Sequence, residues 1–73
     1  MNVEERIKEI IEDIVGIYPN LTDTLDSLEL DDFDKVEIIV ELEGEFAISI
    51  PDDKAEGFKS VEDIVNYINE KTS

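Results

Sequence analysis

Residues 30–46 read Leu30-Asp31-Asp32-Phe33-Asp34-Lys35-Val36-Glu37-Ile38-Ile39-Val40-Glu41-Leu42-Glu43-Gly44-Glu45-Phe46. This stretch predicts a helix that begins near Asp31 or Asp32, because acidic side chains accept hydrogen bonds from unpaired amides and suit the positive end of a helix. Its apolar side chains make a surface wide enough to contact more than one neighbour, and carboxylates occupy the other side. The stretch is therefore an acidic, amphipathic helix.

A further helix and a long connection precede this stretch. Apolar residues recur at spacings of three and four from Val3 to Val15, which predicts a helix that Asn2 can cap and Gly16 can end. Residues 17–30 have no sustained hydrophobic period, so they are predicted to form a connection without regular structure. A connection this long is often functional. Four leucines are expected to hold this connection on the core: Leu21, Leu25, Leu28 and Leu30.

Two helices are predicted after it, one of them short. The alternating residues 46–50 lack a partner strand and are interpreted as an extended loop. Residues 51–56 begin with proline, which suits the first turn of a short helix, and Gly57 ends it. Ser60 and Asp63 have capping-box spacing at the start of the last helix. The fold class is all-α, a small four-helix bundle in one domain, residues 1–73.

Composition excludes several classes of function. Six Lys plus Arg against 21 Asp plus Glu give a net charge of −15, which disfavours nucleic acid and anionic membranes as partners. No cysteine or histidine is present, so zinc fingers, thiol nucleophiles and imidazole catalysis are excluded, and we expect a protein that is not an enzyme. No signal peptide or membrane span is visible, and a cytoplasmic monomer is expected.

The whole chain resembles acyl carrier proteins in the order and spacing of its segments. The similar segments are Met1-Asn2-Val3-Glu4-Glu5-Arg6-Ile7, Val36-Glu37-Ile38, Leu42-Glu43, Glu45-Phe46, Ile50-Pro51-Asp52-Asp53-Lys54-Ala55-Glu56, Ser60-Val61 and Asn66-Tyr67-Ile68. The resemblance implies the acyl carrier bundle, with three longer helices, one short helix and a long first loop. It also implies 4′-phosphopantetheine as the prosthetic group.

The resemblance places one unexpected residue at the attachment position. Acyl carrier proteins have an Asp-Ser-Leu triplet at the start of their second helix, and the serine holds the phosphopantetheine arm. The aligned triplet here is Asp31-Asp32-Phe33, so Asp32 stands where the serine would be. A carboxylate cannot form that phosphodiester link, and this register predicts a chain without the arm.

Other interpretations of these residues stay open. A literal Asp26-Ser27-Leu28 triplet lies five residues earlier and offers Ser27 as an alternative attachment point, or as an ordinary loop hydroxyl. Asp32 can be a helix-capping or first-turn acid. It can also mark a natural relative that lost its serine, or a deliberate replacement that blocks modification.

The resemblance also implies two surfaces on and beside the second helix. Acyl carrier proteins dock this helix onto basic patches of their partner enzymes. The positions that resemble the docking residues are Asp31, Asp34, Glu37, Glu41 and Glu43. The residues expected to border an acyl cavity are Phe33, Val36, Ile39, Ile48 and Phe58. No metal site is predicted, since Lys54 stands where a calcium loop needs an oxygen ligand.

Three functions are compatible with these features. The first is an acyl-carrier-type protein that docks onto enzymes of fatty acid or polyketide synthesis, with thioester carriage in doubt because the serine is replaced. The second is a carrier-like adaptor or decoy without a prosthetic arm. The third, an acidic interaction domain unrelated to acyl transfer, is disfavoured by the similarity of the third and fourth helices.

Overall fold

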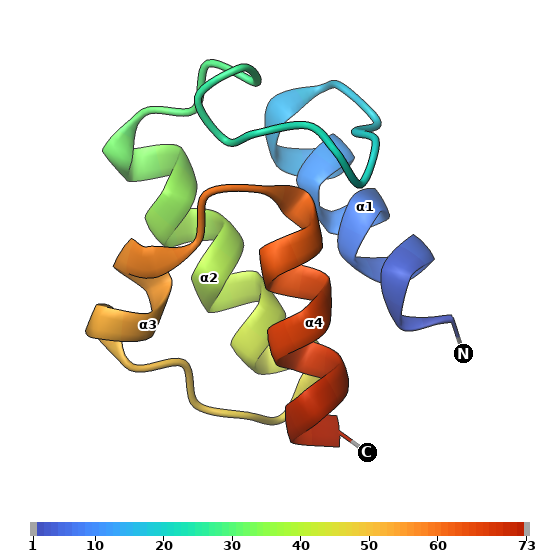
Figure 1. Ribbon diagram of the computed structural model, residues 1–73, viewed down its shortest axis with the longest axis vertical. Coiled ribbons are helices and arrows are strands. Elements are labelled where there is room, and N and C mark those ends of the chain that lie inside the picture. Colours follow the sequence, from blue (N-terminus) through green and yellow to red (C-terminus); the bar gives the residue numbers. More distant parts are fainter. Residues whose placement is uncertain (1, 73) are drawn as a thin grey trace.

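Four helices form the fold of the part of the chain that the structure describes, and side-chain hydrogen bonds cap the first turns of three of them. The computed structural model describes residues 2–72. Its elements are α1 (Val3–Val15), α2 (Asp32–Phe46), α3 (Asp52–Gly57) and α4 (Val61–Thr72), arranged as in Figure 1. No strand longer than one isolated bridge, Thr24 with Ser60, occurs in the described residues. The predicted all-α bundle is confirmed.

Both predicted ends of α1 are confirmed. The Asn2 side-chain oxygen accepts a hydrogen bond from the Glu5 amide at 3.1 Å and satisfies one of the free amides of the first turn. Gly16 ends the helix with a φ of 88°, a left-handed conformation that glycine adopts without steric cost. Its amide donates to the Glu12 carbonyl at 2.7 Å.

α2 begins as predicted and ends beyond its glycine. The Asp31 carboxylate caps the helix by accepting a hydrogen bond from the Asp34 amide at 2.8 Å. Gly44 lies inside the last turns, and the helix continues to Phe46. Ala47 then takes a left-handed conformation with a φ of 55°, which turns the chain away from the helix axis.

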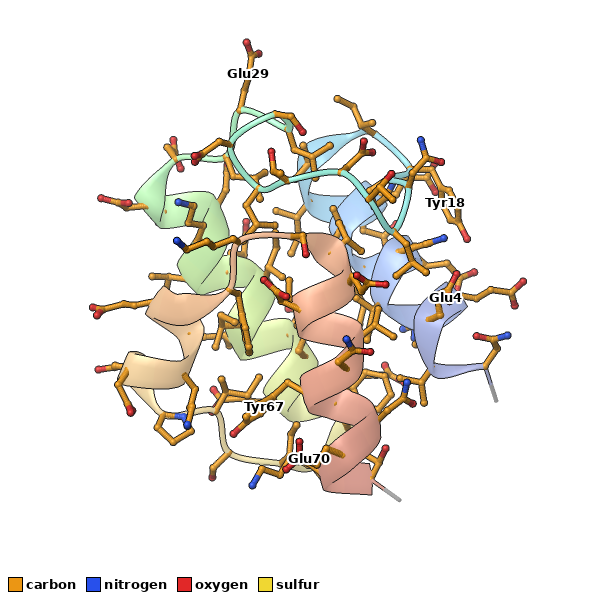
Figure 2. All side chains as sticks on the ribbon, in the orientation of Figure 1. Glu4, Tyr18, Glu29, Tyr67 and Glu70 are labelled. Carbon is orange, nitrogen blue, oxygen red and sulfur yellow. The ribbon has the colours of Figure 1, made fainter. Side chains whose placement is uncertain are left out.

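The connection between α1 and α2 crosses one end of the bundle (Figure 1). As predicted, leucines hold it on the core: Leu25, Leu28 and Leu30 are buried, and Leu21 is half-buried. At its outer edge Glu29 points away from the body of the protein (Figure 2), with a φ of 58°. The connection is therefore anchored by apolar contacts although it lacks regular structure.

Backbone hydrogen bonds also tie this connection to the start of α4. The Leu25 amide donates to the Lys59 carbonyl at 2.9 Å, and the Val61 amide donates to the Asp23 carbonyl at 3.0 Å. The Glu62 amide donates to the Leu21 carbonyl at 3.1 Å. These three bonds make a short antiparallel contact between segments far apart in the sequence.

The predicted capping box of α4 is confirmed, and the short helix differs by one residue. The Ser60 hydroxyl accepts from the Asp63 amide at 3.2 Å, and the Asp63 carboxylate accepts from the Ser60 amide at 3.2 Å. The prediction that the short helix spans 51–56 was wrong at both ends, since α3 is Asp52–Gly57. Pro51 is its N-cap because its φ of −61° and ψ of 150° lie outside the helical region.

The core lies where α1 packs against α2 and α4. Its buried side chains are Ile7, Ile10, Ile11, Leu25, Leu28, Leu30, Ile38, Leu42, Ile50, Val61, Ile64, Val65 and Ile68. α3 lies beside α2 on the side away from α1 (Figure 1). No helix within residues 2–72 has the length and apolar character needed to cross a membrane.

Two glycines predict opposite effects of the same substitution. Gly44→Ala should raise the free energy of unfolding by about 0.5–1 kcal/mol, because alanine favours a helix interior and an added Cβ meets nothing within 4 Å. Gly16→Ala should lower it by about 1 kcal/mol, because a φ of 88° is strained for a side chain. Urea unfolding of both variants measures the difference. Destabilisation by Gly44→Ala would contradict this account of α2.

One ion pair between α1 and α2 predicts a dependence of stability on pH. The Arg6 guanidinium lies 2.9 Å from the Glu45 carboxylate, and this hydrogen bond lowers the pKa of Glu45. A carboxyl group with a lower pKa in the folded state stabilises the protein above its ordinary pKa, and this contribution is lost as pH falls through the folded value. Arg6→Gln should therefore lower the Tm at neutral pH, and the Tm difference from the parent should disappear in acid.

Thermal unfolding from about neutral pH down to about pH 3 tests this expectation. Glu9→Gln is the matched control, because it removes only the longer Arg6–Glu9 contact of 3.5 Å and keeps the pair with Glu45. A Tm difference between Arg6→Gln and the parent that stays constant into acid would contradict the assignment.

Candidate functional site

The start of α2 presents Asp32, the residue that the sequence predicts at the attachment position. Asp31 is the N-cap, and Asp32 is the first residue of the helix with an exposed side chain. The cap hydrogen bond to Asp34 belongs to Asp31, so Asp32 is a first-turn acid rather than the capping residue. Its carboxylate is favoured there by the helix dipole.

Ser27, the alternative attachment residue, lies in a tight turn of the connection. Its hydroxyl donates to the Thr24 carbonyl at 2.8 Å and accepts from the Thr24 amide at 3.1 Å. The Thr24 hydroxyl in turn accepts from the Ser27 amide at 3.0 Å. The Ser27 hydroxyl therefore holds the turn together, five residues before α2 begins.

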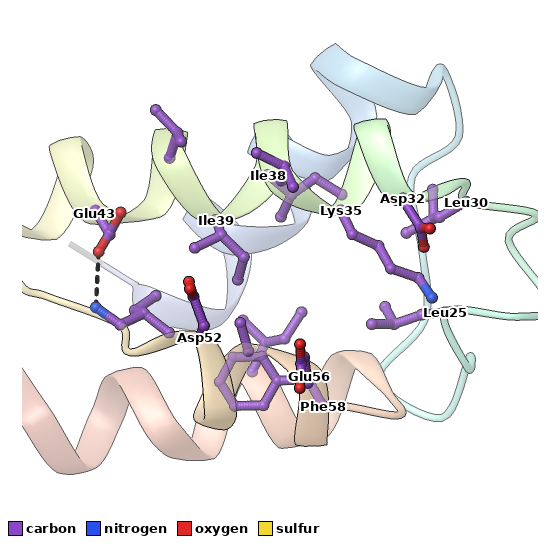
Figure 3. Close-up of a pocket in the computed structure, with 15 residues that line it drawn as sticks. Leu25, Leu30, Asp32, Lys35, Ile38, Ile39, Glu43, Asp52, Glu56 and Phe58 are labelled. Atoms are coloured by element: carbon purple, nitrogen blue, oxygen red, sulfur yellow. Dashed lines mark hydrogen bonds between the residues drawn. The ribbon is translucent and has the colours of Figure 1, made fainter.

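A groove of about 570 Å³ opens between α2 and α3 (Figure 3). Its apolar lining is Leu25, Leu30, Val36, Ile38, Ile39, Val40, Ile50, Ala55, Phe58 and Ile64. Its charged residues are Asp32, Lys35, Glu43, Asp52 and Glu56. Asp32 and Lys35 lie at one end of the groove and Glu43 lies toward the other. The groove thus has an apolar floor and a mostly acidic rim.

The structure brings three of the five expected cavity residues to this groove. Val36, Ile39 and Phe58 line it. Phe33 does not, since it lies in the first turn of α2 with 74% of its surface exposed. Ile48 does not either, because it follows the left-handed residue Ala47 and packs half-buried against the core. Phe33 and Ile48 therefore do not line this groove, and their place at an acyl cavity stays a prediction.

Several lining residues were missed by the sequence prediction. Ile38 lies four residues before Leu42, and this helical spacing could have indicated that both residues face inward. Leu25 and Leu30 were predicted as core residues of the connection and lie in the groove as well. Ile50 precedes the proline of the short helix, and no local pattern indicated that it would face α2.

The expected docking residues do not all share one side of α2. Glu37 and Glu41 are exposed, and Asp34, three residues before Glu37 on the same side of the helix, is half-exposed. Asp31 is exposed at the cap. Glu43 lies two residues after Glu41 and thus on the opposite side of the helix, where it is half-buried.

An exposed apolar stripe runs beside the acidic one. Phe33, Val36 and Val40 are 74%, 63% and 58% exposed and follow the spacing of one helix face. Each is followed directly in the sequence by an acid of the acidic stripe, so the two stripes run in parallel along α2. We call these six residues the docking face: Phe33, Asp34, Val36, Glu37, Val40 and Glu41. This surface can offer charge and apolar contact together.

Metal binding has no support in the described residues. No group of three or more acidic side chains within residues 2–72 is arranged to hold a metal ion. The three acids of the short helix, Asp52, Asp53 and Glu56, are exposed.

Comparisons with known proteins agree on one family. Residues 5–68 match the family described as a phosphopantetheine attachment site. The acyl carrier proteins of Clostridium perfringens strains SM101 and ATCC 13124 are each 43% identical over 72 residues, covering 93% of this chain and 95% of theirs. The crystal structure of an acyl carrier protein from Thermotoga maritima superimposes with a TM-score of 0.78 at 23% identity, covering 90% of this chain and 81% of that one. This last likeness supports the fold alone.

Proposed function

This chain belongs to the acyl carrier protein family, and we propose that it docks onto biosynthetic enzymes through α2 while carrying no acyl thioester of its own. Family members are carrier proteins rather than enzymes, and they bear 4′-phosphopantetheine. The observation that carries the proposal is Asp32 at the start of α2, which the resemblance aligns with the modified serine of the family. We also propose that the chain is a cytoplasmic monomer with a single domain.

The residues at the start of α2 do not fit the prosthetic group. Its attachment forms a phosphodiester to a hydroxyl oxygen, and the first turn offers the carboxylates of Asp32 and Asp34 instead. The nearest serine, Ser27, lies in the connection with its hydroxyl bonded to Thr24. The first turn of α2 therefore offers no hydroxyl to carry the arm.

The docking face supports the other half of the proposal. α2 carries six carboxylates and one ammonium group, so its field attracts basic surfaces and raises the rate of association. The exposed stripe of Phe33, Val36 and Val40 lies next to the acidic one and can be buried once a partner has arrived. Partners of this kind are enzymes of fatty acid or polyketide synthesis with a basic patch beside an apolar one.

Docking without an arm gives this chain a specific role. A member of the family that docks without an arm occupies the partner's site and delivers nothing, so it acts as an adaptor or decoy. Asp32 favours this role, because it offers no hydroxyl for attachment and leaves the docking face intact.

Loss of modification can be tested by restoring the serine. Incubated with coenzyme A and a promiscuous phosphopantetheinyl transferase, the parent chain should gain no mass. Asp32→Ser should gain one phosphopantetheine group, because the hydroxyl then stands at the start of α2. Intact mass measures both, and the double variant Asp32→Ser with Ser27→Ala should be modified equally well. An adduct on Ser27 of the parent would overturn the register.

Docking can be tested by reversing charge on the acidic stripe. Glu37→Lys with Glu41→Lys should weaken capture by a basic carrier-dependent enzyme at least tenfold at low salt, and added salt should reduce the difference. Glu12→Lys with Glu62→Lys is the matched control, since both acids are exposed on other helices and the change in net charge is identical. Equal loss in both double variants would mean that net charge, rather than the docking face, governs capture.

A further inference from the structure

Glu43 differs from Glu45, the acid of α2 that pairs with the Arg6 side chain, because its side chain accepts a backbone amide from another segment. Its carboxylate accepts a hydrogen bond from the Ile50 amide at 2.8 Å, and the bond is partly buried. Ile50 is itself a buried core residue. The bond crosses from α2 to the segment just before α3, so it joins two elements rather than two turns of one helix.

The backbone of Glu43 holds the same segment. Its carbonyl accepts the Ala47 amide, and also the Ile48 amide at 3.3 Å. With the bond from Ile50, one residue receives three hydrogen bonds from residues 47–50. The Ile50 amide has no backbone acceptor within residues 2–72, so loss of the carboxylate would leave it unpaired at a partly buried position.

This contact lies at the groove. Glu43 and Ile50 are both among its lining residues. In Figure 3 the bond, drawn as a dashed line from Glu43, lies toward the end of the groove far from Asp32 and Lys35. A hydrogen bond between α2 and the segment before α3 therefore bridges the groove at this point.

We propose that Glu43 is a positioning residue that fixes residues 47–50 against α2 and thereby sets the depth of the groove. The Glu43 carboxylate then stabilises the fold, and it is not part of the docking face. This inference rests on the fold and the family, and it holds whether or not the chain carries an arm.

A charge-neutral variant separates this role from docking. Glu43→Gln keeps an oxygen that can accept the Ile50 amide and removes the charge, whereas Glu43→Ala removes both. If Glu43 positions the segment, the glutamine variant should resemble the parent and the alanine variant should not. If Glu43 instead attracts a basic partner, both variants should lose capture equally. Glu41→Gln and Glu41→Ala are the matched controls on the exposed side of the same helix.

Amide hydrogen exchange at Ile50 is the direct measurement. Glu43→Ala should speed this exchange at least about tenfold, which corresponds to losing a hydrogen bond to a charged acceptor. Glu43→Gln should stay within about threefold of the parent, and the Glu41 variants should leave the rate unchanged. Unchanged exchange in Glu43→Ala would overturn the proposal.

Two further measurements address the groove and the partner. The neutral apolar dye Nile red should bind Glu43→Ala several-fold more tightly than the parent, because residues 47–50 can then move away from α2, and it should bind Glu43→Gln like the parent. Capture by a basic carrier-dependent enzyme should be unchanged in Glu43→Gln and reduced in Glu41→Gln. Reduced capture by Glu43→Gln would return Glu43 to the docking face. If Glu43→Ala fails to fold, Ile50 exchange and capture in Glu43→Gln still decide the question.

Discussion

The rotation of α2 about its own axis is the constraint on which the other features depend. Ile38 and Leu42, one turn apart, are its two buried residues and face the core. Once they are buried, the positions of all remaining side chains on the helix follow from its period. Phe33, Val36 and Val40 face solvent, the acids beside them do the same, and Glu43 turns toward residues 47–50.

The two ends of α2 make this rotation unambiguous. Asp31 caps the first turn and so fixes Asp32 as the first helical residue. Ala47 turns the chain in a left-handed conformation, which brings Ile50 back beside the helix. A side chain in that conformation is unfavourable by roughly 1 kcal/mol, and the hydrogen bonds to Glu43 are present to offset it.

Local patterns were enough to predict most of the fold. Asn2, Gly16, Ser60 and Asp63 define helix ends through hydrogen bonds to residues three or four positions away, and such contacts are visible in the sequence. The site was harder to predict. Apolar residues occur on nearly every side of α2, so the sequence did not distinguish its inner face from the exposed stripe that includes Phe33. The bond of Glu43 to Ile50 spans a turn that no periodic pattern describes.

The antiparallel contact between the connection and the start of α4 has a consequence for how this chain folds. Leu25 and Asp23 find their backbone partners at Lys59 and Val61, which are near the other end of the sequence. During synthesis these backbone groups of the connection therefore lack their partners until residues 59–62 have left the ribosome. Since α1 and α2 both precede residues 59–62 in the chain, their pairing can come before the ordering of the connection during synthesis.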